Sequence, residues 1–380
     1  MDLLEYKAEN SRRLRQDWRD KREVFRSLPE IVNLNHSNAC NLRCVTCWHH
    51  TGVPIHAVKL RDVERICHQL FPAARKVVLT AAGEPLINDF DEIVALAAHY
   101  QVKIDMFTSC FNMTEERFRA SRALFDLLHV SMDCPDKDGY ERIRVRSSYE
   151  RVVDNLRMMK AILDAEGKSF VYHCQAAILK STVRFLPAFV GFVRELGFDL
   201  LHVQRVFKTH AGLEGEDILT AMPRAELDAI VAETAAEARR LNQTVILHEI
   251  GYPNVIADPP PRPEDPPLLQ FRHDGVCWFV GQSIGVNHGG EVFPCCYPTD
   301  IYLGDALREP MRRIWNGPAM RRLRRQFHTG KLNVFCQNCF LVNENPVEPR
   351  NFDFYRRQAR MRWFEVKKRM AKRFQAVRRA

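Results

Sequence analysis

Three cysteines, Cys40, Cys44 and Cys47, lie within eight residues in a C-x3-C-x2-C spacing. Three thiolates on one short loop can hold three irons of a cubane iron–sulfur cluster and leave the fourth iron open, whereas a closed zinc site wants a fourth ligand. His49 and His50 follow at once and are candidates for that ligand. The loop alone therefore leaves zinc and iron–sulfur open.

A second set of thiols occurs near the other end of the chain. Cys277 and Cys295 form one separated pair, and Cys336 and Cys339 form a C-x2-C knuckle. Two such pairs can close a four-thiolate site for zinc or for a [4Fe–4S] cluster, and the types of residue do not decide between them. Cys296, beside Cys295, is a competing ligand or a free thiol. Two structural zinc ribbons are the alternative to two clusters.

Length and composition favour an intracellular protein of two or three domains. The chain has 380 residues, of which 46% are hydrophobic, and no apolar run reaches the length of about 18 residues that a membrane helix needs. The charged N-terminus lacks the apolar core of a secretory signal, so we expect a cytoplasmic protein. Twelve cysteines in a reducing compartment indicate metal or redox chemistry rather than disulfides.

The net charge of +9 is concentrated in one segment. Residues 355–380 carry eleven Lys or Arg and one acidic residue, which gives +10 there and −1 over the remaining 354 residues. Apolar residues recur in this segment at helical spacing, so we predict a basic amphipathic helix. It would lie on the inner membrane surface as a peripheral contact, bind nucleic acid or an acidic partner, or dock on the body of the protein. A nucleic-acid partner for the body is not indicated.

Strand and helix patterns alternate between the two thiol sets. This alternation predicts six βαβ-type units and a parallel α/β sheet, with the three-cysteine loop directly after the first strand. Ligands of parallel sheets bind beyond the carboxyl ends of the strands, which is where this loop falls. The expected strands are 31–35, 76–80, 102–107, 127–132, 170–179 and 200–206, and the expected helices are 58–71, 89–100, 114–122, 149–165, 186–196 and 223–241.

We expect the chain to divide into five parts. A short strand at 244–249 follows the sixth unit, and residues 283–287 and 291–293 form the arms of a predicted hairpin. Six prolines in ten residues, 258–267, indicate a semi-rigid connector. The parts are an N-terminal helical extension at 1–28 (one helix over about 4–27), a core at 29–250, a proline-rich linker at 251–274, a small cysteine-rich domain at 275–345, and the basic helix at 346–380.

The motifs resemble those of the radical S-adenosylmethionine (SAM) superfamily, in the subgroup with a SPASM or Twitch auxiliary-cluster domain. The resemblance spans about residues 30–340. It rests on the loop of Cys40, Cys44 and Cys47, on Ala82-Gly83-Glu84-Pro85, on Phe107-Thr108-Ser109-Cys110, on Ser131-Met132-Asp133-Cys134-Pro135 with Tyr140 to Arg144, on the C-x12-G-x4-C of Cys277 to Cys295, and on Leu303-Gly304-Asp305 and Ile314-Trp315-Asn316.

The chain departs from the family pattern at several positions. Thr46 stands at the usually aromatic position, with Trp48 displaced by two residues, and Ala82 replaces the first Gly of G-G-E-P. Ser109-Cys110 replaces the Asn-Gly of the usual T-N-G. No cysteine follows Cys339, so the thiols suffice for one auxiliary cluster, which is the Twitch-like number.

The resemblance implies a partial (β/α)6 barrel with two [4Fe–4S] clusters. Cys40, Cys44 and Cys47 would hold the cluster that binds SAM, and Cys277, Cys295, Cys336 and Cys339 would hold the auxiliary cluster. One electron from a reductant such as flavodoxin or ferredoxin would cleave SAM to a 5′-deoxyadenosyl radical, which abstracts hydrogen from a substrate. His49 and His50 then become candidates for the substrate pocket.

The resemblance also implies the residues that contact SAM. Gly83 would allow close backbone approach, Glu84 would pair with the ammonium group, and Pro85 would fix the turn. Ser131 and Arg144 could hold the ribose and the carboxylate. Further candidates for SAM binding are Trp48, Thr108, Ser109 and Asp133.

The leading functional hypothesis is a radical SAM oxidoreductase or epimerase. Its substrate would be a small molecule, carbohydrate-like or lipid-linked, because only about 28 residues precede the core, too few for a peptide-recognition domain. A ribosomal-peptide maturase is the alternative, and a zinc- or iron–sulfur-stabilised binding protein is the alternative of another class. Cys110, Cys134 and Cys296 are candidate hydrogen-atom donors for an epimerisation, whereas Cys67 and Cys174 are expected to be buried core residues.

Overall fold

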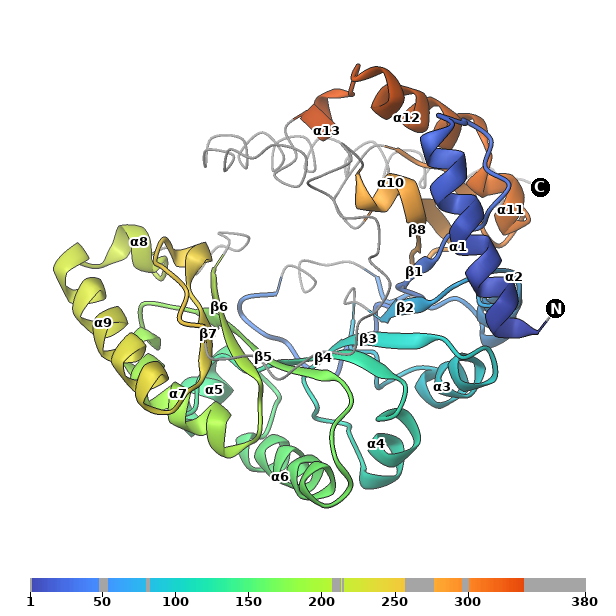
Figure 1. The fold of residues 1–380 in the computed structure, drawn as a ribbon. Helices are drawn as coiled ribbons and strands as arrows, with labels where there is room; N and C mark the ends of the chain where they lie inside the picture. Colours follow the sequence, from blue (N-terminus) through green and yellow to red (C-terminus); the bar gives the residue numbers. More distant parts are fainter. Residues whose placement is uncertain are drawn as a thin grey trace, which may run out of the picture.

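A curved sheet with helices on its outer side dominates the computed structural model, which describes residues 2–47, 54–79, 83–206, 213, 215–256, 277–295 and 301–337 (Figure 1). Its strand order is β10-β9-β8-β1-β2-β3-β4-β5-β6-β7, and β1 to β7 run parallel. The predicted parallel α/β sheet is therefore confirmed. The strands are β1 (Ile31–Leu34), β2 (Lys76–Leu79), β3 (Lys103–Thr108), β4 (Phe125–Ser131), β5 (Val171–Ile178), β6 (Leu200–Arg205) and β7 (Thr244–Ile246).

The six expected helices follow strands β1 to β6 in turn, as predicted. Side-chain caps mark several of their starts, for example Thr114 and Ser148, which accept hydrogen bonds from backbone N–H groups three residues on. The helices are α2 (Leu60–Leu70), α3 (Phe90–His99), α4 (Glu115–Ser121), α6 (Tyr149–Glu166), α7 (Leu186–Glu195) and α9 (Arg224–Arg240). Not predicted were α5 (Lys137–Ile143), α8 (Ile218–Ala221), and the 3-10 turns η2 (Val183–Phe185) and η3 (His248–Ile250).

The two faces of the sheet differ in polarity because side chains alternate along a strand. In β5, Tyr172 and Cys174 are fully buried in the apolar core, whereas their neighbours His173 and Gln175 are partly exposed. The same alternation occurs in β3 and β6. The apolar set packs beneath the helices, so the polar set lines the concave inner side of the sheet, which we call the lumen.

The N-terminal extension is helical over a shorter stretch than predicted. Helix α1 spans Leu3–Arg19 and begins with a capping box of Asp2 and Glu5. The prediction of helix to about residue 27 is wrong, because Lys21 has a φ of 53° and the chain turns back. The buried carboxylate of Asp17 accepts hydrogen bonds from the backbone N–H groups of Arg26 (2.7 Å) and Ser27 (3.1 Å) and so fixes the returning segment.

The cysteine-rich part extends the main sheet. Strand β8 (Ser283–Val286) pairs in parallel with β1 and forms an antiparallel hairpin with β9 (Glu291–Phe293), so the predicted hairpin is confirmed. Strand β10 (Gly304–Asp305) pairs antiparallel with β9. The amide of Asn33 on β1 donates a 2.7 Å hydrogen bond to the Ser283 hydroxyl on β8. The hairpin therefore shares its backbone ladder with the core.

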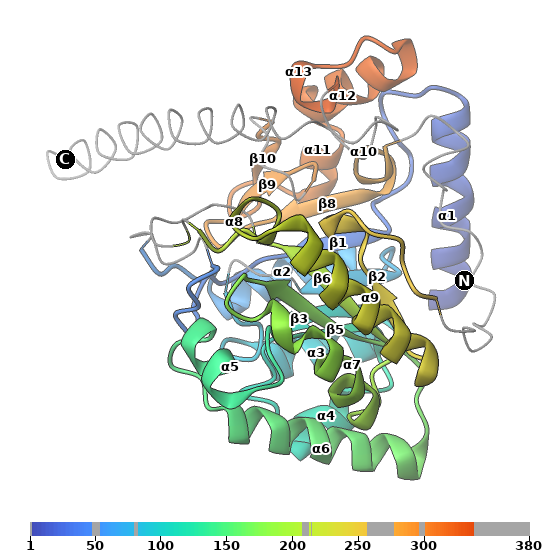
Figure 2. The same cartoon turned by 90° about the vertical axis from the view of Figure 1, so that its left-hand side faces the viewer.

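Within the described residues, this part of the chain also contains the helices α10 (Trp278–Gln282), α11 (Met311–Trp315), α12 (Pro318–Thr329) and α13 (Val334–Gln337). Helices α10 to α12 lie beyond β8 at one end of the sheet, beside α1 (Figure 2). Trp315 is fully buried and donates a 3.0 Å hydrogen bond to the carbonyl of Ser27. The Arg324 guanidinium lies 3.7 Å from the centre of the Phe25 ring and 4.3 Å from the centre of the Trp315 ring. These cation–π contacts join α11 and α12 to the segment that follows α1.

Some predicted features fall outside the described residues. These are Trp48, His49, His50, Cys296 and Cys339, most of the proline-rich linker, and the basic segment 355–380. Among the residues that the structure describes, no helix has the length and apolar character needed to cross a membrane.

Candidate active site at the carboxyl ends of the strands

The three-cysteine loop follows β1 and is fixed mainly by backbone hydrogen bonds. The N–H groups of Arg43 and Val45 donate to the carbonyls of Val145 (2.8 Å) and Ile143 (2.9 Å). At the start of the loop, the side chain of Asn38 bonds to the backbone of the segment at Pro54–His56. The shape of the loop therefore depends little on its own side chains.

The thiols of Cys40, Cys44 and Cys47 are brought together by this loop. Cys44 is buried and the other two are partly exposed. Burial is the main cause that raises the pKa of the Cys40 thiol to about 11, and the nearby Cys44 and Cys47 thiols raise it further. Such thiols become thiolates only when a cation compensates their charge. The chemistry of this donor set therefore fits a metal cluster.

Gly83 permits the motif after β2 to touch the cysteine loop. A Cβ atom on Gly83 would lie 2.3 Å from the carbonyl oxygen of Ala39, and the N–H of Glu84 donates a 2.8 Å hydrogen bond to that same oxygen. The close approach predicted for Gly83 thus exists, although its partner here is the backbone before Cys40. This contact joins the turn after β2 to the start of the three-cysteine loop.

The Glu84 carboxylate joins three of the expected SAM-binding residues into one cluster. It is buried, and it accepts hydrogen bonds from the Thr108 hydroxyl (2.5 Å) and from the N–H and hydroxyl of Ser109 (2.9 and 2.8 Å). The N–H of Leu86 adds a fourth at 3.3 Å. A carboxylate offers about four acceptor positions, so these donors occupy them all and tie the end of β3 to the turn of Glu84 and Pro85.

A buried ion pair links the end of β4 to the cysteine loop. The Arg144 Nε atom lies 2.7 Å from the Asp133 carboxylate, which also accepts a 2.8 Å hydrogen bond from the N–H of Ala177. The Arg144 Nη1 atom lies 3.9 Å from the sulfur of Cys44. Burial opposes the charge on Arg144, but Asp133 and Cys44 raise the pKa of the guanidinium above its usual value. A fixed positive charge thus faces one predicted cluster ligand.

Strands β4 to β6 present polar side chains to the lumen beside Ser131. The Nδ1 atoms of His129 and His173 are 3.3 Å apart, and the Gln175 amide donates a 2.5 Å hydrogen bond to Gln204. Burial and the neighbouring histidines lower the pKa of His129 to about 3, so its imidazole is neutral at physiological pH. Gln204 was a candidate for the pocket from its place on the sixth expected strand. His129, His173 and Gln175 were not singled out from the sequence, although the alternation of apolar and polar residues in β5 was a signal for the last two.

The candidate hydrogen-atom donors in the described part of the chain lie in the apolar core. Cys110 and Cys134 are completely buried, as are Cys67 and Cys174, whose predicted place in the core is confirmed. A Cβ atom on Gly139 would lie 2.6 Å from the Cys134 sulfur, which shows how tightly that thiol is enclosed. None of these four thiols is exposed to the lumen.

Three of the four predicted auxiliary ligands are described. Cys277 is buried at the start of α10, and Cys295 follows β9, so the two bracket the hairpin as expected. Cys336 lies on α13, and the Asn333 amide is 3.2 Å from its sulfur. N–H donors to a thiolate sulfur are a usual means of tuning iron–sulfur clusters. The fourth predicted ligand, Cys339, lies outside the described residues, so the auxiliary ligand set stays a prediction.

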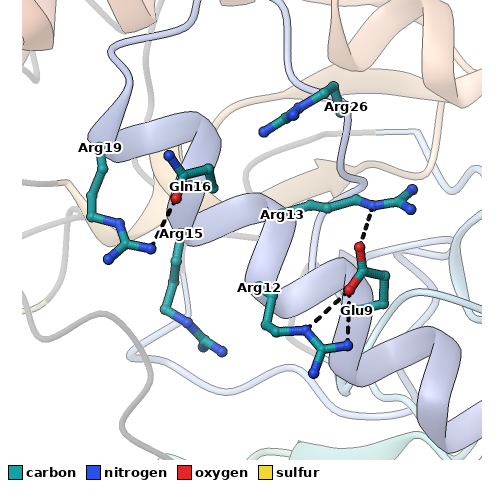
Figure 3. A pocket seen from close by; sticks show the side chains of 7 residues that line it. All are labelled: Glu9, Arg12, Arg13, Arg15, Gln16, Arg19 and Arg26. Carbon is teal, nitrogen blue, oxygen red and sulfur yellow. Dashed lines mark hydrogen bonds and ion pairs between the residues drawn. The ribbon is translucent and has the colours of Figure 1, made fainter.

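A positively charged hollow lies away from these motifs, on the outside of α1. It has a volume of ≈ 630 Å3 and contains none of the predicted ligands. Figure 3 shows Arg12 and Arg13 facing the single carboxylate of Glu9, while Arg19 faces Gln16. Its lining residues are Glu9, Arg12, Arg13, Arg15, Gln16, Arg19 and Arg26. The excess of guanidinium groups favours an acidic partner.

Two family models match the chain. The model of the radical SAM superfamily matches residues 34–172, and that of SPASM, an iron–sulfur cluster-binding domain, matches residues 277–340. The chain belongs to the radical SAM superfamily. It carries a SPASM domain, and its cofactors are [4Fe–4S] clusters and SAM.

Solved structures and one curated protein resemble this radical SAM protein. Streptococcus suis SuiB bound to SAM matches with a TM-score of 0.59 and 16% identity, covering 88% of this chain and 75% of SuiB. Native anSMEcpe with bound AdoMet matches with a TM-score of 0.54 and 16% identity, covering 82% and 87%. These likenesses confirm the predicted partial barrel with a C-terminal auxiliary domain.

The curated relative is molybdenum cofactor biosynthesis protein 1 of Drosophila melanogaster. It is 33% identical over 130 residues, which are 32% of this chain and 23% of that protein. The chain therefore spans less than a quarter of this relative, and the match says nothing of a shared substrate.

Proposed function

We propose that Cys40, Cys44 and Cys47 hold the [4Fe–4S] cluster that binds SAM, and that this radical SAM protein removes hydrogen from a polar substrate in the lumen. When bound, the cluster and SAM supply a 5′-deoxyadenosyl radical for hydrogen abstraction. The observation that carries the proposal is the contact of the Glu84 N–H with Ala39, one residue before Cys40, because it joins the two motifs that this chemistry requires.

The protein's own residues hold the loops around the proposed cluster site in place and set the charge beside it. Through its hydrogen bonds to Thr108 and Ser109, Glu84 holds the end of β3 against the turn after β2, so these two loops move together. Asp133 holds Arg144, and Arg144 places a positive charge beside the sulfur of Cys44. A guanidinium near a coordinating thiolate stabilises its negative charge in a site from which water is largely excluded.

The lumen supports a hydroxyl-bearing substrate, such as a carbohydrate-like molecule, and an oxidation rather than an epimerisation. Gln175, Gln204 and the neutral imidazole of His129 offer hydrogen bonds without strong charge. Cys110 and Cys134 lie in the apolar core, which does not favour them as donors of a returning hydrogen atom.

We propose Cys277, Cys295, Cys336 and Cys339 as ligands of a single auxiliary cluster. When bound, it supplies an acceptor for the electron that an oxidation leaves on the substrate. Ligation by four thiolates would close the cluster to direct contact with substrate. The amide of Asn333 would tune the cluster through its contact with Cys336.

Peptide maturation is the second candidate. SuiB has been solved with its precursor peptide SuiA at a TM-score of 0.57, and anSMEcpe with the Cp18Cys peptide at a TM-score of 0.52. Incubation with deuterated polyols or with peptides would separate the two functions. Transfer of deuterium into 5′-deoxyadenosine from a polyol supports the first, and transfer only from a peptide supports the second.

The arginine-lined hollow on α1 supports a proposal for where the reductant docks. Flavodoxins and ferredoxins are acidic, and the arginine-lined hollow carries five guanidinium groups against one carboxylate (Figure 3). We propose that the electron donor docks there. Arg15→Glu together with Arg19→Glu should slow flavodoxin-dependent SAM cleavage at low salt and leave dithionite-dependent cleavage unchanged.

Anaerobic metal analysis and SAM cleavage test the proposed function. We expect about eight iron atoms and a similar amount of sulfide per chain, as two cubane clusters require. Dithionite should produce 5′-deoxyadenosine from SAM, and Cys44→Ala should abolish it. Cys67→Ala, which removes a buried core thiol, is the matched control and should retain the activity. Zinc in place of iron would refute the enzyme hypothesis.

A further inference from the structure

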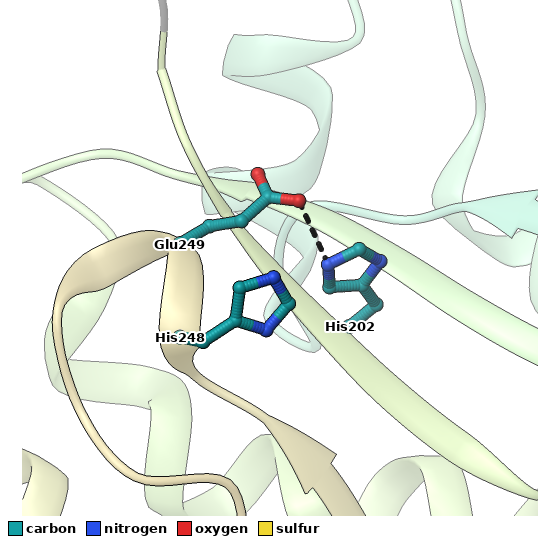
Figure 4. A group of neighbouring side chains, drawn as sticks. All are labelled: His202, His248 and Glu249. Carbon is teal, nitrogen blue, oxygen red and sulfur yellow. Dashed lines mark ion pairs between the residues drawn. The ribbon is translucent and has the colours of Figure 1, made fainter. Parts of the chain in front are cut away.

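Two imidazoles and a carboxylate converge on the lumen side at the β6–β7 edge of the sheet. His202 belongs to β6, and His248 and Glu249 belong to η3, the turn after β7. One ligand atom from each lies within 4.8 Å of the other two. Figure 4 shows the three side chains facing one another, with the Nε2 of His202 3.0 Å from a carboxylate oxygen of Glu249.

The contact between His202 and Glu249 is close, but its direction is poor for a hydrogen bond. The Nε2 atom is buried and, within the described part of the chain, lacks a partner in hydrogen-bonding direction, even though the carboxylate oxygen lies at 3.0 Å. A buried ring nitrogen of this kind is costly unless another species satisfies it. Two metal ligands are close together and yet poorly aligned for a hydrogen bond, because both point at the ion and not at each other.

The ligand atoms are held from both sides before any ion binds. Strand β6 is paired with β5 and with β7, so the backbone of His202 is fixed. The side chain of Asn254 accepts hydrogen bonds from the N–H groups of Leu247 (2.8 Å) and His248 (3.0 Å), which fixes the turn. Preorganisation of this kind lowers the cost of binding.

A chain of amides orients the carboxylate. The Gln204 amide nitrogen lies 3.4 Å from the same oxygen of Glu249, and Gln204 in turn accepts a 2.5 Å hydrogen bond from Gln175. Supporting hydrogen bonds of this type are a regular feature around metal ligands and contribute to affinity.

We propose that His202, His248 and Glu249 bind a divalent transition-metal ion of the zinc type. Imidazole nitrogen suits zinc and its neighbours in the periodic table, whereas magnesium and calcium prefer oxygen ligands throughout. Three protein ligands leave a fourth position for water or for an oxygen of a substrate in the lumen. The ligand atoms of His202 and Glu249, now 3.0 Å apart, must separate to the spacing of about 3.4 Å that metal–ligand bonds of about 2.1 Å require, and the exposed His248 side chain can turn toward the same centre.

Zinc titration of the anaerobically reconstituted protein tests the site. We expect one zinc ion per chain beyond the iron, measured by equilibrium dialysis and mass spectrometry. His248→Ala and Glu249→Gln should each weaken binding at least ~100-fold, and Gln204→Ala by ~10–100-fold. His99→Ala removes an exposed histidine on α3 and should leave zinc binding unchanged. Magnesium should not compete.

Cobalt shows which atoms bind the ion and whether the site is independent of radical chemistry. Co2+ in this site should give weak d–d bands without the strong sulfur-to-metal absorption of thiolate ligands. Binding should persist in Cys44→Ala, so loss of SAM cleavage and loss of this site are distinguishable. Unchanged zinc affinity in His248→Ala and Glu249→Gln, or a cobalt spectrum dominated by thiolate bands, would overturn the proposal.

Discussion

Replacement of Gly83 by Ala is the sharpest test of how the cysteine loop is positioned. The new Cβ would lie 2.3 Å from the carbonyl oxygen of Ala39, 2.7 Å from the carbonyl carbon of Asn38 and 2.9 Å from the Ala39 nitrogen. All three are backbone atoms, so no flexible side chain can move aside. The turn after β2 must therefore separate from the cysteine loop.

The required separation and its cost follow from this geometry. Real Cβ atoms essentially never come within 3.0 Å of another heavy atom, so the 2.3 Å contact must lengthen by 3.0 − 2.3 = 0.7 Å or more. Overpacking of this kind costs about 1–3 kcal/mol, and loss of the Glu84 N–H···O=C bond adds about 1 kcal/mol. We expect the free energy of unfolding to fall by about 2–4 kcal/mol in total.

Hydrogen exchange and urea unfolding should report this change, with a matched glycine as the control. Peptides that cover residues 37–47 and 83–88 should lose protection in Gly83→Ala, and cluster content after reconstitution should fall with SAM cleavage. Gly191→Ala, inside α7, meets nothing closer than 4.0 Å. It should stabilise the protein by about 0.5–1 kcal/mol, because alanine is the better helix former.

The reasoning would be refuted if Gly83→Ala kept wild-type protection in both peptides and full cluster content. A uniform loss of protection across the whole protein would also contradict it, since the clash is confined to one contact between two loops. Loss of SAM cleavage without any change in exchange at residues 37–47 would mean that Gly83 acts on SAM directly.

Three further predictions concern a histidine, an ion pair and a tryptophan. The pKa of His129 is lowered from 6.5 to about 3, so the unfolded chain binds the proton first as pH falls. His129 should therefore lower the free energy of unfolding by about 2 kcal/mol between pH 8 and pH 5. Urea unfolding of His129→Gln should show a pH dependence that is smaller by this amount, and an unchanged pH dependence would contradict the assignment. Asp133→Asn leaves the buried Arg144 guanidinium without its carboxylate and should lower the free energy of unfolding by about 3–5 kcal/mol; a loss below 1 kcal/mol would show that the pair is solvated. Trp315→Phe leaves the Ser27 carbonyl without its hydrogen-bond donor and should lower the free energy of unfolding by about 1–3 kcal/mol in the same assay. An unchanged free energy of unfolding would mean that water replaces the indole.

Most of the parallel sheet could be predicted because its signal is local. Each strand from β1 to β6 carries apolar residues that are either consecutive or alternate with polar ones, and each following helix has an apolar face at helical spacing. The end of α1 could not be predicted in this way. It depends on Asp17 capturing the backbone of Arg26 and Ser27, and such a contact between two turns leaves no periodic mark in the sequence.

The sequence motifs of the candidate site could be predicted, but the contacts that join those motifs could not. Cys40 was singled out by its spacing from the other thiols, and Gly83 and Glu84 by the resemblance of their segment to a family motif. The pairing of Asp133 with Arg144 was missed because it requires α5, a helix of only seven residues, to return the chain across the site. The contact of His202 with Glu249, on which the proposed metal site depends, likewise requires the position of η3 after the last parallel strand, which only the folded chain fixes.

The departure from the family motif at Thr46 lies in a loop that backbone hydrogen bonds hold in place. The cysteine loop is fixed through the N–H groups of Arg43 and Val45 and through the carbonyl of Ala39, so an unusual side chain at Thr46 does not disturb it. Cys110 is the instructive exception. It stands where the family usually has glycine, and it keeps a φ of 58°, the left-handed conformation that favours glycine.

A non-glycine residue in this conformation costs about 1–2 kcal/mol, but the Cys110 side chain is completely buried in the apolar core. Burial of a small apolar side chain contributes a similar amount, which offsets the strain. The backbone of the family turn is therefore retained without its glycine: Thr108 and Ser109 still reach Glu84, and Cys110 occupies the core on the other side of the turn. The geometry of this turn is thus retained through backbone shape, while the residue types that usually produce that shape have changed.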